Sequence, residues 1–252
     1  MRASRSDCQR RRAIIAARLR IHLEKASSLR AGAMAAADTR AAMMALRRWQ
    51  SERLARTYPD LLAHPRHRGP ALFFFEELYG PKDLSGRDRD VQRILPTMTR
   101  LLPAAALSTI ADAMELDALS EQLDSALLAA LKAQGGDTTA LTEESYARAY
   151  RACANRPERE RQIAFVQTIG GELEALTRVP LLEGTIRLMA APARAAGLSA
   201  LHNFLAVGFS TFKKMGKAAD FLATITRRET LLMERLFDGH PAPFDALEAA
   251  AP

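Results

Sequence analysis

The chain has 252 residues, of which 48% are hydrophobic and 26% charged. This balance is enough to bury a sizeable core, and it excludes collagen-like, disulfide-scaffold and wholly disordered proteins. Lysine and arginine outnumber aspartate and glutamate by 36 to 29, which gives a net charge of +7 and a pI near 9.8. Residues 1–30 hold the whole excess, so the remainder of the chain is electrically balanced. Their nine basic side chains are Arg2, Arg5, Arg10, Arg11, Arg12, Arg18, Arg20, Lys25 and Arg30, against Asp7 and Glu24.

Membrane and secretory segments are not expected. No apolar run reaches the roughly 18 to 20 residues that a membrane-spanning helix needs, and arginines interrupt the apolar positions of the N-terminus. Cys8 and Cys153 lie far apart in the sequence, which favours neither a disulfide framework nor a cysteine zinc site. We therefore expect a cytoplasmic protein without a transmembrane segment.

The first half of the chain reads as helical. Ala, Leu, Arg, Glu and Met dominate long segments, and apolar residues recur at helical spacing instead of alternating with polar ones. A first helix is predicted over 6–29, with Ile15, Leu19 and Leu23 on one face. After an Ala/Gly joint at 31–37, Asp38 is expected to cap a second helix that ends near 58–59.

Proline and glycine mark the helices that follow. Pro70 opens a short apolar helix over 70–79, which Gly80 and Pro81 end. Ser85 and Asp88 resemble a capping box for a helix over 86–102, in which Pro96 predicts a kink. The longest helix is predicted from 104 to about 134, where two glycines stop it.

Residues 135–141 form the best candidate for a linker, and a joint between two subdomains is possible there. Thr142 is expected to cap a helix to about 154, followed by helices over 157–177, 180–192, 198–216 and 218–237. Residues 241–252 are rich in Ala and Pro and are expected to be a short flexible tail. We therefore predict an all-α fold of about nine helices in one domain, residues 1–240.

The most unusual stretch is FFFEELYGPKDLSGRDRDVQR, residues 73–93, which we call the charged corner. An aromatic helix, a Gly-Pro turn and a charged helix start follow one another there. In a functional interpretation its acidic and basic side chains surround a cleft. Burial there could shift the pKa of a carboxylate so that it acts as a general acid or base. The candidate ligand-binding residues are Glu76, Glu77, Tyr79, Asp83, Arg87, Asp88 and Arg93.

A structural interpretation of the corner competes with the functional one. Carboxylates in a first helical turn complement the helix dipole, Asp88 suits a capping box, and Asp90 with Arg93 is an ordinary i, i+3 pair. The same segment resembles an uncharacterised, conserved-hypothetical family of proteobacterial all-α proteins. This resemblance implies a bacterial cytoplasmic protein, and it carries over no catalytic residues.

A second stretch, residues 201–216, places several apolar residues and Gly208 near one face of a helix, where another helix or a flat ligand could approach. His202 and Ser210 share this helix but lack a third catalytic member. Neither a metal nor a cofactor is expected. The sequence contains no Glu-x-x-His pair, no Cys-x-x-Cys-His, no phosphate loop and no dinucleotide fingerprint, although a haem-ligating histidine is not excluded.

The basic N-terminal helix is a candidate anion-binding surface. Its candidate residues are Arg10, Arg11, Arg12, Arg18 and Arg20. No helix-turn-helix spacing follows and no aromatic residues are interleaved for base stacking, so nucleic-acid binding is possible but disfavoured. The structural interpretation is a peripheral helix whose arginines stay solvated or pair with acidic groups on the body.

The sequence does not identify a function. The leading hypothesis is a non-enzymatic cytoplasmic helical protein that acts through a protein partner or through homo-oligomerisation. One alternative is a small-molecule-binding or enzymatic bundle that uses the charged corner. A second alternative is weak binding of nucleic acid or anionic membranes by residues 1–30.

Overall fold

The computed structural model describes residues 5–78, 80 and 85–247, and these form an all-α domain without β-strands. The predicted fold class is confirmed, and the helix number differs because α3, α4, α9 and α10 are short segments of five to seven residues. In chain order the elements are α1 (Arg5–Ala35), α2 (Ala37–Thr57), α3 (Pro59–Ala63), α4 (Arg68–Leu72), the π-helix η1 (Phe73–Leu78), α5 (Ser85–Leu101), α6 (Ala104–Ala133), α7 (Glu143–Ala152), α8 (Arg156–Thr177), α9 (Leu182–Leu188), α10 (Ala190–Ala195), α11 (Ser199–Met215) and α12 (Ala219–Asp238).

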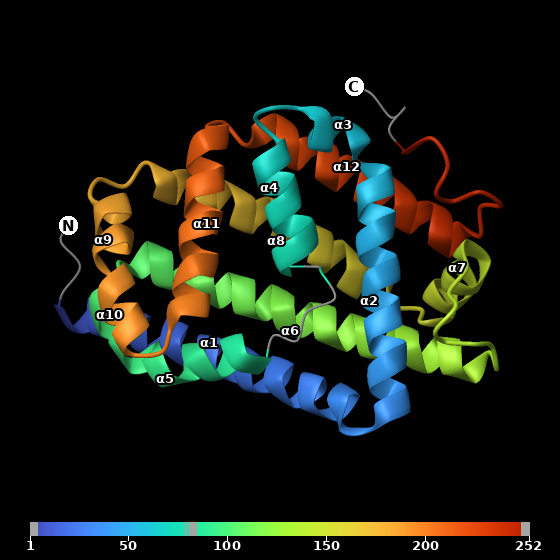
Figure 1. The fold of residues 1–252 in the computed structure, drawn as a ribbon, viewed down its shortest axis with the longest axis horizontal. Helices are drawn as coiled ribbons and strands as arrows, with labels where there is room; N and C mark the ends of the chain where they lie inside the picture. Colours follow the sequence, from blue (N-terminus) through green and yellow to red (C-terminus); the bar gives the residue numbers. More distant parts are fainter. Residues whose placement is uncertain (1–4, 79, 81–84, 248–252) are drawn as a thin grey trace.

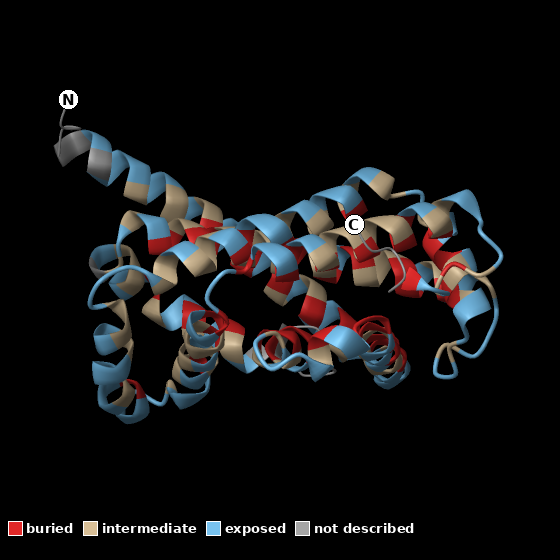
Figure 2. Ribbon diagram, turned by 90° about the horizontal axis from the view of Figure 1, so that it is seen from above, coloured by how far each residue is buried: buried red, intermediate tan, exposed pale blue. Residues whose placement is uncertain are grey.

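Long helices lie side by side along the molecule, and shorter ones cross them (Figure 1). The helix α6 packs between α1 and α8, and α8 packs in turn against α12. The helices α2, α4 and α11 stand across this layer in Figure 1, and α9 and α10 close one end. Figure 2 shows buried segments of the two layers facing each other. The space between α2, α6, α8 and α12 is therefore the interior of the molecule.

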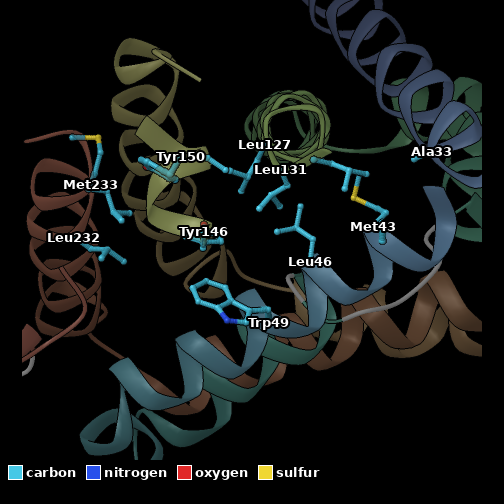
Figure 3. Close-up of a cluster of buried hydrophobic side chains, with 14 of the residues drawn as sticks. Ala33, Met43, Leu46, Trp49, Leu127, Leu131, Tyr146, Tyr150, Leu232 and Met233 are labelled. Atoms are coloured by element: carbon cyan, nitrogen blue, oxygen red, sulfur yellow. The ribbon is translucent and has the colours of Figure 1, made fainter. Parts of the chain in front are cut away.

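Aromatic and aliphatic side chains fill one end of this interior (Figure 3). Trp49 of α2 stacks on Tyr146 of α7 with ring centroids 4.1 Å apart, and Tyr146 lies 5.9 Å from Tyr150. All three are buried, together with Leu127 and Leu131 of α6. Aromatic pairs in this geometry add roughly 0.5–1.5 kcal/mol to the free energy of unfolding beyond their buried area. This cluster fixes α2, α6 and α7 relative to one another.

The predicted cap at the start of α7 is confirmed. Thr142 accepts a hydrogen bond from the backbone nitrogen of Ser145 at 3.1 Å, and the Ser145 side chain completes the capping box. The helix α6 ends within one residue of the predicted position, where Gly135 takes a positive φ of 72°. The residues 135–141 form a turn, and the prediction of two subdomains on either side of it stays a prediction.

The predicted end of the first helix is wrong. The helix α1 continues to Ala35 through Gly32, where a glycine costs up to about 1 kcal/mol relative to alanine. Ala33, the next residue, is buried in the cluster of Met43 and Leu46, and this burial favours continuation of the helix. The joint is therefore much shorter than expected, and α1 is one residue longer than α6.

The helix predicted over 70–79 begins two residues earlier, at Arg68, and its type changes along its length, because α4 continues directly into the π-helix η1. Phe73, Phe74 and Phe75 are consecutive and all buried, at 7%, 5% and 5% exposure. Phe73 packs on Phe204, Phe74 on Phe212 and Phe221, and Phe75 on Tyr58. Three successive rings spread over about 200° of a regular α-helix, so here the chain buries them against three different elements.

Two further boundaries differ from the predictions. Pro192 does not bound a helix, because it lies in the first turn of α10, where proline is tolerated. Residues 241–247, expected to be flexible, lie on the body. Phe244 packs edge-on against Trp49, and Leu247 is 2% exposed. Residues 248–252 of the expected tail lie outside the described residues.

Candidate functional site: a polar cavity beside a buried ion cluster

The start of α5 turns inward. Asp88 is almost fully buried and accepts a hydrogen bond from Nε of Arg30 on α1 at 2.9 Å. Arg87, beside it, is nearly buried and places Nη2 3.1 Å from Asp117 on α6. Asp88 therefore forms an ion pair that ties α5 to α1, and the capping box predicted for Ser85 and Asp88 stays a prediction, because the Ser85 side chain lies outside the described residues.

Arg30 is the centre of this cluster, and its side chain is 0% exposed. It pairs with three carboxylates: Asp88, Asp117 and Glu121, the last at 2.6 Å from Nη1. Arg47 of α2 donates to both oxygens of Glu121, at 2.6 and 2.7 Å. With Arg87, three guanidinium groups face three carboxylates, and we call these six residues the Arg30 cluster.

Within the cluster, the opposite charges counteract the effect of burial on one another's pKa to different extents. Burial raises the pKa of Asp88 and of Glu121, although arginines beside each of them oppose the shift. Burial acts in the same direction on Asp117, but Arg87 and Arg30 outweigh it and lower the pKa of that carboxyl. Burial would lower the pKa of Arg30, and its three carboxylate partners raise it instead. The ion pairs of the cluster therefore connect α1, α2, α5 and α6 in the interior.

The rest of the charged corner does not converge with this pair. The side chain of Glu76 is exposed, and Arg93, also exposed, pairs with Asp90 at 3.2 Å. Tyr79, Asp83 and the side chain of Glu77 lie outside the described residues. Among the candidate residues that the structure describes, only Arg87 and Asp88 are brought together, and neither lines the cavity described next.

A cavity of about 130 Å³ lies next to the cluster, between α2, α6, α7, α8, α12 and η1. Arg47, Asp117 and Glu121 belong to both the cluster and the cavity wall. Gly80 also lines it, and a Cβ at Gly80 would lie 2.2 Å from the carbonyl oxygen of Glu76, so only glycine fits there. The polar wall consists of Arg47, Gln50, Arg53, Tyr58, Asp117, Ser120, Glu121, Asp124, Tyr146, Tyr150, Arg159, Gln162 and Glu229.

Most charged groups of this wall are paired. Arg53 donates from Nη1 to Glu229 at 2.5 Å, and the Tyr58 hydroxyl donates to the same oxygen at 2.8 Å. Burial and the neighbouring Glu229 carboxylate raise the pKa of Tyr58 well above its usual value, so the phenol keeps its proton and donates. Asp124 accepts from the amide of Gln50 at 3.0 Å.

Arg159 is the exception. Its side chain lies on the buried face of α8 with 6% of the residue exposed, and Nη1 donates to Gln162 at 3.1 Å. The guanidinium carbon sits 4.7 Å from the centroid of the Tyr150 ring. Nε and Nη2 are buried without a hydrogen-bond partner. None of the carboxylates in the described part of the chain lies within 4 Å of this guanidinium.

The positions of Arg30 and Arg159 in the helical pattern of the sequence indicate that both are buried. Arg30 continues the Leu19, Leu23 and Ala26 stripe of α1 at helical spacing, and those three residues are fully buried. Arg159 precedes Ile163 and Val166 by four and seven residues on α8. An arginine on an apolar stripe is buried only if something compensates its charge. The sequence pattern therefore marks both arginines, although it does not identify their partners.

The basic helix divides into engaged and exposed arginines. Arg12 donates to the carbonyl oxygens of Thr99 and Leu102 at the end of α5, at 2.7 and 2.6 Å. Arg18 pairs with Asp112 and Glu115 of α6. Arg10, Arg11 and Arg20 are exposed. Two of the five candidate anion-binding residues are thus bound within the chain itself.

The second stretch, in α11, contacts its own fold. Nε2 of His202 lies 2.8 Å from the carbonyl oxygen of Ile186. A Cβ at Gly208 would lie 2.8 Å from the ring of Phe73, so an aromatic ring of the chain makes the close approach expected there. In the described residues, no His, Cys, Asp and Glu side chains are grouped as a metal site.

The comparisons with known proteins add a family and no activity. None of the helices in the described residues is long and apolar enough to cross a membrane. No curated protein and no solved structure matches the chain. A family model described as "Domain of unknown function (DUF8198)" matches residues 30–243. The match contains the Arg30 cluster and the cavity and leaves out Arg10 to Arg20. The chain therefore belongs to this uncharacterised family of proteins, described as DUF8198.

Proposed function

We propose that the protein is a non-catalytic binding protein whose interior cavity holds one small organic molecule. The observation that carries the proposal is the buried polar wall, in which a guanidinium edge has no partner within the chain. An apolar cavity of about 150 Å³ suffices to bind benzene. The cavity here, at about 130 Å³, has room for a molecule slightly smaller than that or for a few waters.

The cavity wall has an apolar part and a polar part, which supports binding of an amphipathic molecule. Phe74, Val166 and Ile225 provide apolar contacts, while Ser120 and Gln162 lie on the polar part. Pockets with an apolar lining and a few convergent polar groups are typical ligand sites. Asp117, Glu121 and Glu229 are all committed to ion pairs with arginines, which favours binding over proton transfer by these carboxylates.

Filling the cavity tests this function. Ser120→Leu adds an apolar side chain at the cavity wall, and Ser125→Leu, on the same helix but outside the wall, is the matched control. Ligand-observed NMR with a library of small molecules, and mass spectrometry of compounds released on denaturing purified protein, are the two readouts. We expect wild type and Ser125→Leu to bind compounds that folded Ser120→Leu does not. Absence of any bound compound in wild type, or unchanged binding by Ser120→Leu, contradicts the proposal.

A second candidate function is self-association, and the surface of one end favours it. The described residues include eight large apolar side chains that are exposed, and six belong to the end formed by α9, α10 and α11 with the turn before α9. These six are Val179, Leu181, Leu188, Met189, Leu205 and Val207, with Leu181 85% exposed and Leu188 79%. Apolar side chains gathered in this way mark interaction sites more often than isolated ones do.

Light scattering after gel filtration tests self-association through this end. We expect wild type to elute as a dimer or larger oligomer, and Leu181→Gln/Leu188→Gln to elute as a monomer. Ile14→Gln, an exposed apolar residue of α1, is the control and keeps the wild-type mass. A monomeric wild type at high micromolar concentration, or an unchanged mass in the double variant, rejects this candidate. A cytoplasmic location and a bacterial source remain predictions.

A further inference from the structure

Arg159 differs from the other buried arginines of the described chain. Each of the others has a carboxylate partner: Arg30 with Asp88, Asp117 and Glu121, Arg47 with Glu121, Arg53 with Glu229, and Arg228 with Asp60. Arg159 has the amide oxygen of Gln162 and the face of Tyr150, both of which are neutral groups. Burial raises the pKa of Tyr150 and of Tyr146, so neither phenol supplies a negative charge.

The two unpartnered nitrogens belong to the same edge of the guanidinium. Nη1 is occupied by Gln162, and Nε and Nη2 form the side-on edge, whose two N–H bonds are nearly parallel. This edge matches the two oxygens of a carboxylate, and such bidentate pairs are among the strongest hydrogen-bonded contacts in proteins. Both atoms are covered from water, so neither solvent nor the chain compensates the charge.

We propose that Arg159 anchors the carboxylate of a small organic acid, whose apolar body fills the cavity against Phe74, Val166 and Ile225. This inference rests on the proposed function and names its ligand class. Because protein atoms cover Nε and Nη2 in this structure, the proposal requires the Arg159 side chain to rotate toward the cavity when the ligand binds. The ligand then provides the counter-ion that every other buried arginine receives from within the chain.

The wall favours a single negative charge. Glu229 and Asp124 also line the cavity, and Asp124 accepts a hydrogen bond from the neutral amide of Gln50. A dianionic phosphate would bring a second negative charge close to these carboxylates, and like charges at short range repel. A monocarboxylate satisfies Arg159 without that repulsion.

Thermal unfolding with paired probes tests the proposal. The probes are acetate, propionate and butyrate, each compared with its neutral amide and with sodium chloride at equal ionic strength, and inorganic phosphate is a further arm. We expect at least one carboxylate to raise the melting temperature of wild type at pH 7 while its amide does not. The affinity for that carboxylate should fall about tenfold or more in Arg159→Met.

Two variants make the result specific. Arg159→Lys keeps the charge but loses the side-on edge, and we expect it to lose most of the affinity as well. Arg161→Met removes an arginine from the exposed face of the same helix, where the side chain is 59% exposed, and should bind like wild type. If Arg159→Met does not fold, the comparison of Arg159→Lys with Arg161→Met decides.

The outcomes separate the two proposals. Equal binding of amides and carboxylates, retained in Arg159→Met or Arg159→Lys, overturns the carboxylate anchor and leaves the ligand-binding cavity standing. Phosphate binding without carboxylate binding overturns the ligand class. If neither the carboxylates nor the amides raise the melting temperature of wild type, the carboxylate anchor is overturned. If wild type also binds no compound of the NMR library, the proposed function is overturned as well.

Discussion

Arg30 and Arg159 are two buried arginines on long helices, and their surroundings differ in one respect. Arg30 meets three carboxylates from α5 and α6, whereas Arg159 meets an amide and an aromatic ring. A charge whose partners lie within the chain contributes to folding, because its desolvation cost is compensated once the helices pack. A charge without such partners lowers stability unless a ligand completes its surroundings. The contrast therefore separates a structural arginine from a binding one.

The largest effect should follow from breaking the complete cluster. Arg30→Met removes the centre of the cluster and leaves three carboxylates in or near the interior with one fewer positive charge. Breaking a buried ion pair by removing one partner costs about 3–5 kcal/mol. Urea unfolding should show a loss of this size. Arg20→Met, at an exposed position of the same helix, should leave the free energy of unfolding unchanged. Equal stability of Arg30→Met and wild type would contradict the structural role of the cluster.

The acids of the cluster should respond to pH with opposite signs. The folded pKa of Asp117 is lowered, so its stabilising contribution is complete above its unfolded pKa of about 3.9 and is lost as pH falls through the folded value. Asp117→Asn should cost about 2 kcal/mol at pH 7, and its difference from wild type should shrink on acidification below about pH 4.

Glu121 provides the matched comparison. Its folded pKa is raised, so wild type gains stability from this group as pH falls from above the folded value toward the unfolded one. The stability of wild type relative to Glu121→Gln should therefore rise as pH falls over that interval. Chemical unfolding between pH 7 and pH 3 measures both differences. The same pH trend for the two variants would show that the compensation within the cluster is wrong.

A smaller effect concerns the support that positions Arg159 on α8. Gly170 lets α8 approach α12, since a Cβ there would lie 2.3 Å from a methyl carbon of Leu222. Gly170→Ala should destabilise the protein by about 1–2 kcal/mol, because the buried Leu222 has to move. Gly171→Ala meets nothing within 4 Å and should gain up to about 1 kcal/mol from helix propensity. Thermal unfolding of the two neighbours compares them directly, and similar shifts would argue against close packing here.

The smallest effect should come from Arg159 itself. Arg159→Met removes a charge that has no ion pair to lose, and the methionine stem keeps the apolar contacts. The free energy of unfolding should change by less than about 1 kcal/mol in the absence of ligand. Urea unfolding beside Arg30→Met measures the ratio of the two effects. A loss as large as that of Arg30→Met would place Arg159 among the structural arginines.

The sequence predicted the helices better than the contacts between them. Helix type and most boundaries followed from apolar spacing and from local signals such as Thr142 with Ser145, because those signals act within one turn. The end of α1 did not follow from local signals. Gly32 disfavours a helix locally, but the burial of Ala33 against other helices favours continuation of α1. The rings of the π-helix η1 pack on four aromatic residues from other parts of the sequence, Tyr58, Phe204, Phe212 and Phe221, which local signals do not reveal.

The charged corner illustrates what the sequence could show of the site. Its unusual composition drew attention to Arg87 and Asp88, yet Arg30, the partner of Asp88, is 58 residues away in the sequence, and Asp117, the partner of Arg87, is 30 residues away. Ion-paired networks and ligand sites share the same residue types, and only geometry distinguishes a complete set of partners from an incomplete one. Arg159 was not singled out, because a single arginine in a charged helix start is ordinary in sequence.

One NMR measurement tests the central contrast in a single sample. The Nε–H groups of Arg30 and Arg159 are assigned in a proton–nitrogen spectrum, and the carboxylate that raises the melting temperature is titrated in. We predict that the Arg159 Nε–H proton moves downfield toward the position of a carboxylate-bonded group, while the Arg30 signal, already bonded to Asp88, stays in place. An Arg159 signal that does not move at saturating carboxylate, or that moves no more than the Arg30 signal, would contradict the account.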